Sequence, residues 1–163
     1  MEQICNEPEL SLRFSEISRP DEFVSPFEGE EYVLLLVINR TDILYREQKD
    51  LSERIIASRC RYAVCFGFEC SSWDGSIDYA FIFSDPNLSP PDERFVMTTW
   101  HEDESIEDVV EYLRFNTVFD EFVPKRFLVL FVGDDSELRR RVFETSSRFF
   151  GERPIVSSIE PNQ

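Results

Sequence analysis

Short apolar runs alternate with amphipathic segments along most of the chain. The runs at residues 32–38, 62–66, 95–100 and 127–132 have apolar residues at successive positions, as is typical of strands covered by helices on both faces. Apolar residues recur at helical spacing between the runs, most clearly at Ile106, Val109, Val110 and Leu113. The alternation predicts a three-layer α/β sandwich on a mostly parallel sheet of about four strands, flavodoxin-like or Rossmann-like in class.

The two ends of the chain lack this pattern. Residues 1–30 are acidic, contain prolines at positions 8, 20 and 26, and alternate only weakly at 10–14. We therefore expect an extended N-terminal arm with at most one edge strand. Residues 31–151 form the predicted α/β domain, in which Ser71 or Ser72 is expected to cap the second helix. Residues 152–163 contain two prolines and are expected to be a C-terminal tail.

The net charge of the chain limits the kinds of molecule that it is expected to bind. The chain has 33 acidic and 17 basic residues, a net charge of -16. Residues 1–124 hold 27 acids and 10 bases, whereas residues 125–163 hold six acids and seven bases. Such a surface disfavours nucleic acid and anionic membranes and favours a basic protein partner, although solubility alone also accounts for it.

The chain shows no sign of export or membrane insertion. No apolar run approaches the roughly 20 residues of a membrane span. The N-terminal residues lack the basic and apolar regions of a secretory signal. Four cysteines without such a signal suit a reducing compartment, so we expect a cytoplasmic protein.

Acidic residues follow the predicted strands, and the carboxyl ends of parallel strands meet at one edge of a sheet. The candidate binding residues at this edge are Asp42, Asp74, Trp100, Asp103, Asp134 and Asp135. Paired carboxylates can bind a cation or transfer protons. Acidic residues are also common at helix N-termini, where they cap the helix. This edge, which we call the acidic rim, would therefore be rich in acidic residues even if it bound no ligand.

The same rim contains a candidate nucleophile and base. Cys70 and the single histidine, His101, could form a thiol–imidazole pair, with Glu69 or Glu102 as the orienting carboxylate. A zinc site that adds Cys60 and Cys65 is disfavoured, because C-x4-C-x4-C is not a zinc-binding spacing. We predict neither a metal nor a cofactor.

Signatures of nucleotide binding and of serine hydrolysis are missing from the sequence. It contains no G-x-G-x-x-G, no P-loop and no G-x-S-x-G motif. The favoured hypothesis is a non-catalytic acidic protein-binding module, of the inhibitor or immunity type, that docks on a basic partner. The alternative is a small enzyme that uses the Cys/His pair or the carboxylates at the carboxyl edge of the sheet.

Two pieces of the sequence carry a resemblance. CRYAVCFGFECSSWD and DERFVMTTWHEDE are similar to a family of small uncharacterised bacterial proteins, grouped as a domain of unknown function. The resemblance covers roughly residues 31–134. It implies a bacterial, cytoplasmic setting and carries no activity over to this chain.

Overall fold

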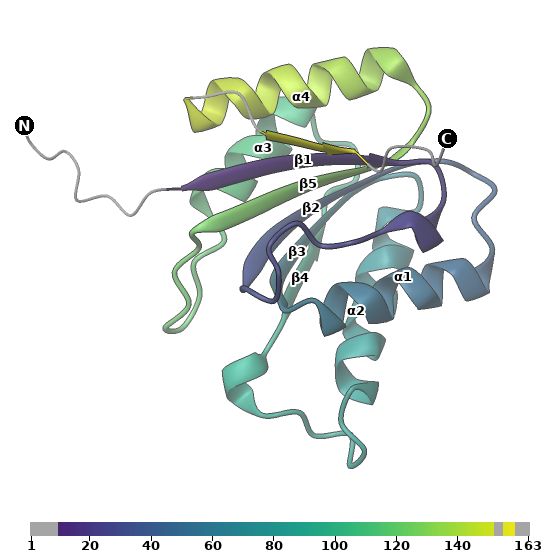
Figure 1. Ribbon diagram of the computed structural model, residues 1–163, viewed down its shortest axis with the longest axis vertical. Coiled ribbons are helices and arrows are strands. Elements are labelled where there is room, and N and C mark those ends of the chain that lie inside the picture. Colours follow the sequence, from purple (N-terminus) through teal and green to yellow (C-terminus); the bar gives the residue numbers. More distant parts are fainter. Residues whose placement is uncertain (1–9, 152–154, 159–163) are drawn as a thin grey trace, which may run out of the picture.

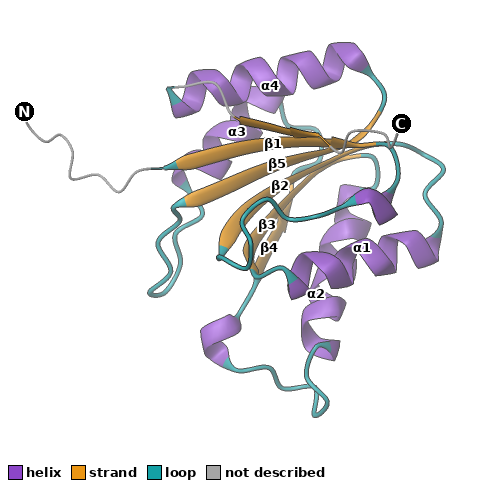
Figure 2. Ribbon diagram, in the orientation of Figure 1, coloured by secondary structure: helices purple, strands orange, loops and turns teal. Residues whose placement is uncertain are grey.

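A single parallel sheet forms the centre of the computed structural model, which describes residues 10–151 and 155–158. Its six strands lie in the order β4-β3-β2-β5-β1-β6, and every pair of neighbours is parallel. Figure 1 shows the sheet between two layers of helices, and Figure 2 shows the same arrangement by secondary structure. The strands are β1 (Ser11–Ile17), β2 (Tyr32–Asn39), β3 (Cys60–Gly67), β4 (Met97–Trp100), β5 (Arg126–Gly133) and β6 (Ile155–Ser158). The helices are α1 (Tyr45–Ala57), α2 (Cys70–Phe83), α3 (Ile106–Phe115) and α4 (Ser136–Phe150). The predicted three-layer, flavodoxin-like α/β class is confirmed.

Each face of the sheet supports its own hydrophobic core. One face packs against α1 and α2, with Leu34, Leu36 and Leu130 from the strands facing Leu51 and Ile77. The other face packs against α3 and α4, where Leu35, Val129 and Phe131 face Val109 and Val142. Strands β2 and β5 are buried on both faces, which explains their unbroken apolar runs.

The strand order reverses direction between β2 and β5. From β2 the chain moves outward through β3 to β4, and then returns to form β5 on the other side of β2. In open parallel sheets, ligands usually bind beyond the carboxyl ends of the strands at such a reversal. Here the backbones crowd together: a Cβ atom added to Gly133, which has φ +156, would lie 2.7 Å from the carbonyl oxygen of Asn39.

The two terminal segments differ from the predicted arm and tail. Within residues 1–30, expected to form an extended arm with at most one edge strand, residues 11–17 form β1, which pairs with β5 on one side and β6 on the other and is therefore not an edge strand. Within the expected tail, 152–163, residues 155–158 form β6. The sheet therefore has more strands than the four expected. No described helix is both long enough and apolar enough to span a membrane.

Candidate functional site

The rim residues predicted from the sequence do lie at the carboxyl edge of the sheet, but several already have structural partners. Asp135 caps α4, accepting hydrogen bonds from the backbone N–H groups of Glu137 and Leu138 at 3.0 and 3.1 Å. Glu102 and Asp103 lie in the exposed turn after β4, and the half-exposed Trp100 ends that strand. The acidic rim is in part the product of helix capping.

His101 is buried and uses both ring nitrogens locally. Its Nδ1 lies 2.9 Å from a carboxylate oxygen of Glu104, and its Nε2 lies 3.0 Å from the hydroxyl oxygen of Thr99. The ring also contacts Tyr112 edge-on, with centroids 4.7 Å apart. These contacts account for both ring nitrogens, so neither is left to activate a thiol.

Cys70 begins α2 and is almost fully buried. Burial raises the pKa of its thiol, and the charge of Glu102 raises that pKa further. A hydrogen bond from the backbone N–H of His101 lowers this pKa, but by less than burial raises it. The predicted thiol–imidazole pair therefore does not form: Cys70 is near the backbone of His101, whereas the imidazole is held by Thr99 and Glu104. The predicted second helix does form, beginning at Cys70. Its N-cap is Glu69, with φ 53, and the prediction that Ser71 or Ser72 caps it is wrong.

We expect Cys70 to react slowly with iodoacetamide, with an apparent pKa above the ordinary value of about 8.5. The reason is that its burial disfavours the thiolate. Peptide-level mass spectrometry of alkylation across a pH series measures this in the intact protein, with the protein in urea as control. His101→Ala should leave the apparent pKa unchanged. An apparent pKa below 8.5 that rises in the variant would restore the Cys/His enzyme hypothesis.

Asp74 is the one candidate carboxylate that lies inside the protein. It is 8 % exposed, and its Oδ1 has no hydrogen-bond partner among the described residues. Burial raises the pKa of Asp74. A hydrogen bond with the Thr98 hydroxyl lowers it, and the negative charge of Asp78 raises it further. Among the described residues, no group of three or more His, Cys, Asp or Glu side chains is placed to hold a metal ion.

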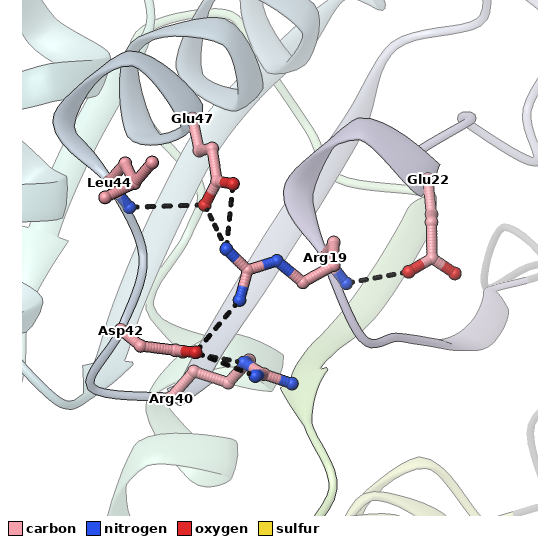
Figure 3. A network of polar contacts seen from close by, with 6 residues as sticks. All are labelled: Arg19, Glu22, Arg40, Asp42, Leu44 and Glu47. Atoms are coloured by element: carbon pink, nitrogen blue, oxygen red, sulfur yellow. Dashed lines mark hydrogen bonds and ion pairs between the residues drawn. The ribbon is translucent and has the colours of Figure 1, made fainter.

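A network of arginines and carboxylates closes the carboxyl edge beside the strand reversal (Figure 3). Arg19, which follows β1, donates to Glu47 at 2.6 and 2.8 Å and to Asp42 at 3.1 Å. Arg40, which follows β2, donates to both oxygens of Asp42 at 2.9 and 3.0 Å. Hydrogen bonding to Asp42 raises the pKa of Arg40, and the charge of Asp134 acts in the same direction. The cavity that remains beside Arg40 and Glu69 is only about 100 Å³, too small for a cofactor.

This network predicts a measurable pH dependence. Hydrogen bonding to Arg40 lowers the pKa of Asp42 to about 2. A lowered folded-state pKa stabilises the protein above the unfolded value of about 3.9, and this stabilisation is lost as the pH falls towards 2. The difference in free energy of unfolding between the wild type and Asp42→Asn should be constant above about pH 5 and shrink between pH 4 and 2. Urea denaturation at each pH measures it, and a difference that does not vary with pH would contradict the network.

A larger opening lies on the outer side of α1 and α2. We call it the α1–α2 groove; its volume is about 670 Å³, and its walls include Tyr45, Tyr79 and Phe83. Helices α1 and α2 contact each other here through polar side chains. The hydroxyl oxygens of Ser52 and Ser76 are 2.7 Å apart, and the Gln48 side chain donates to the Ser72 hydroxyl at 3.1 Å. Tyr79 and Phe83 stack on each other with ring centroids 6.3 Å apart.

The outward face of α2 is a feature that our sequence analysis missed. Tyr79 and Phe83 are each 65 % exposed, and Ile82 is also exposed. The sequence does contain an indication of this face. Residues 79–83 are five successive apolar residues, and such a run places apolar side chains on more than one side of a helix. Arg19 and Arg40 were also missed; Arg40 follows a strand directly, but nothing in the sequence connects Arg19 to the rim.

A family model described as Domain of unknown function (DUF7684) matches residues 13–145. No curated protein and no solved structure matches the chain.

Proposed function

Since the chain belongs to the DUF7684 family, whose description assigns no activity, we propose its function from its own surfaces. We propose that it is a non-catalytic module that binds a basic protein partner, covering it as an inhibitor or immunity protein does. The α1–α2 groove is the docking surface.

The observation that carries this proposal is the apolar outer face of α2. A helix on the surface of a soluble protein normally buries one apolar stripe and exposes polar residues. Helix α2 buries Trp73, Ile77 and Ala80, yet it also exposes Tyr79, Ile82 and Phe83. Exposed clusters of aromatic side chains on a grooved surface are characteristic of protein interfaces.

Charge supports a basic partner. Helix α2 contains two aspartates and no basic residue, and the chain as a whole has a net charge of -16. The charged residues that line the groove, Lys49 and Glu53 of α1, pair with each other at 2.8 Å. Asp78 is exposed on the same helix, but it lies outside the groove lining and accepts a hydrogen bond from the Thr98 hydroxyl at 2.7 Å, so the attraction comes from the net charge of the whole chain. A segment that presents apolar side chains flanked by lysine or arginine would fill the groove and be steered towards it. An amphipathic helix of the partner has this chemistry.

The chemistry of the rim supports a binding role over a catalytic one. Burial raises the pKa of the Cys70 thiol, and both nitrogens of His101 are engaged. Asp42 is held by Arg19 and Arg40. The groove, by contrast, offers exposed aromatic side chains of the kind that dominate binding energies at interfaces.

A pull-down from cells that express the protein natively tests this proposal. The wild-type protein should retain a basic protein at low salt and lose it as salt is raised. Tyr79→Ser and Phe83→Ser should each weaken retention by about thirtyfold or more, as expected for aromatic anchors.

The matched control is Phe115→Ser, because Phe115 is 58 % exposed and belongs to α3 on the opposite face. It should retain the partner as the wild type does. Retention of an acidic protein, or equal loss in all three variants, would overturn the proposal.

A further inference from the structure

A second cavity lies at the opposite edge of the sheet from the acidic rim, where β3 begins and α1 and α2 end. Its volume is about 450 Å³, within the range of small-molecule sites. Ile56, Phe81 and Val96 provide apolar lining, and Arg59, Arg61 and Arg94 provide its positive charge. Three arginines at one cavity stand out in a chain with a net charge of -16.

Arg61 is held in place by the fold, whereas Arg59 is more exposed and has weaker contacts. Arg61 donates to the carbonyl oxygen of Phe95 at 2.9 Å and to Glu31 at 2.7 Å, and it lies over the rings of Phe119 and Phe122. Arg59 donates to the carbonyl oxygen of Gly29 at 3.3 Å and lies 3.8 Å from Glu31. A positioned guanidinium group binds an anion at little cost in side-chain entropy.

Arg94 is the third arginine in the lining of the cavity. It ends the short helix Asp92–Arg94 and forms no ion pair with any described residue. Its guanidinium donors are therefore available to a ligand. Arginine presents paired N–H donors that match the two oxygens of a carboxylate or phosphate group.

The charge at this cavity favours an anion despite two opposing contributions. Glu31 is the only carboxylate among the described lining residues, and it pairs with Arg59 and Arg61. The last residues of α1 and the C-cap of α2, Ser84, also line the cavity, and each helix end carries about half a negative charge. Positive charge remains in excess after both contributions.

We infer that this cavity binds a small organic anion: an apolar body that bears one carboxylate or phosphate group. The apolar side chains would contact the body, while Arg59 and Arg94 would bind the charged group beside Arg61. Cys60 also lines the cavity, but burial raises the pKa of its thiol to about 12. Burial therefore disfavours a reactive thiolate in this cavity.

Binding can be followed at the cavity itself by NMR of the methyl groups of Ile56 and Val96. The probes are 3-phenylpropionate, 2-phenylethyl phosphate and the neutral 3-phenylpropionamide. At least one anion should shift both methyl resonances saturably below about 10 mM, and the amide should not. The two anions distinguish a carboxylate ligand from a phosphate ligand.

Arg59→Gln and Arg94→Gln should each weaken binding of the anion by about tenfold or more, because each removes a charge-assisted hydrogen bond. Arg61 is left intact because its contacts also support the fold. The control is Arg46→Gln, an exposed arginine on α1 outside this cavity, which should bind as the wild type does. No saturable shift with either anion, equal binding of the amide, or equal weakening by Arg46→Gln would overturn the inference.

Discussion

Gly67→Ala is expected to lower the free energy of unfolding by about 3 kcal/mol or more. Gly67 ends β3 with φ +102, a backbone conformation that residues with a side chain rarely adopt. An added Cβ atom would also overlap the carbonyl oxygen of Ile38 in the neighbouring strand, which cannot move without disturbing the centre of the sheet. Urea denaturation of the wild type and the variant measures the difference.

Gly75→Ala is the matched control for this substitution. Gly75 lies inside α2, and an added Cβ atom would meet nothing within 4 Å. Alanine forms helices more readily than glycine, so this variant should be more stable than the wild type by about 0.5–1 kcal/mol. Equal effects of the two substitutions would contradict the close approach of β3 to β2.

Phe14→Ala is expected to cost about 3–5 kcal/mol of unfolding free energy, the range for large aromatic residues in a core. Phe14 lies in β1, is 0 % exposed and packs edge-on against Phe143 with ring centroids 5.4 Å apart. Arg139 lies over its ring, 5.2 Å from the centroid, and pairs with Glu16 of the same strand. The reason for the large cost is that β1 belongs to the folded core.

Val24→Ala tests the same prediction from outside the core. Val24 also belongs to the segment that we expected to be an arm, but it is 70 % exposed. Its substitution should change the free energy of unfolding by less than about 0.5 kcal/mol. If Phe14→Ala were equally mild, β1 would not be an integral strand of the sheet.

The strands that are buried on both faces could be predicted from the sequence, whereas the weak alternation at residues 10–14 predicted at most an edge strand and not the inner position of β1. Residues 32–38 and 127–132 are continuous apolar runs because helices cover both of their faces. Strand β1 mixes apolar residues with Arg13, Ser15 and Glu16, because only the short strand β6 separates it from the edge. Such weak alternation is also typical of an edge strand or a loop.

The position of the rim could also be predicted, because parallel strands bring their carboxyl ends together. The side chains with which the rim residues pair could not be predicted. Arg19 reaches Asp42 and Glu47 across separations of 23 and 28 residues, and no local pattern encodes such contacts. The sequence places Cys70 and His101 near each other, but it does not reveal that the imidazole faces Glu104.

The α1–α2 groove required the packed structure. From the sequence, the apolar residues of α2 count as core residues, since Trp73, Ile77 and Ala80 already predict a buried face. Helix α2 lies beside α1 (Figure 1), and Tyr79 and Phe83 of α2 stay exposed in the folded protein. The cavity lined by Arg59, Arg61 and Arg94 likewise combines residues from β3, the ends of two helices and the loop before β4.

The most direct test of the proposed function is a photo-crosslinking measurement at the groove. The photoreactive residue benzoylphenylalanine replaces Phe83 in one protein and Phe115 in another, and both are irradiated in cells that contain the native partner. The docking proposal predicts a crosslink from position 83 to a basic protein, and none to that protein from position 115. Crosslinks from position 115 alone, or from neither position, would contradict a binding surface on α1 and α2.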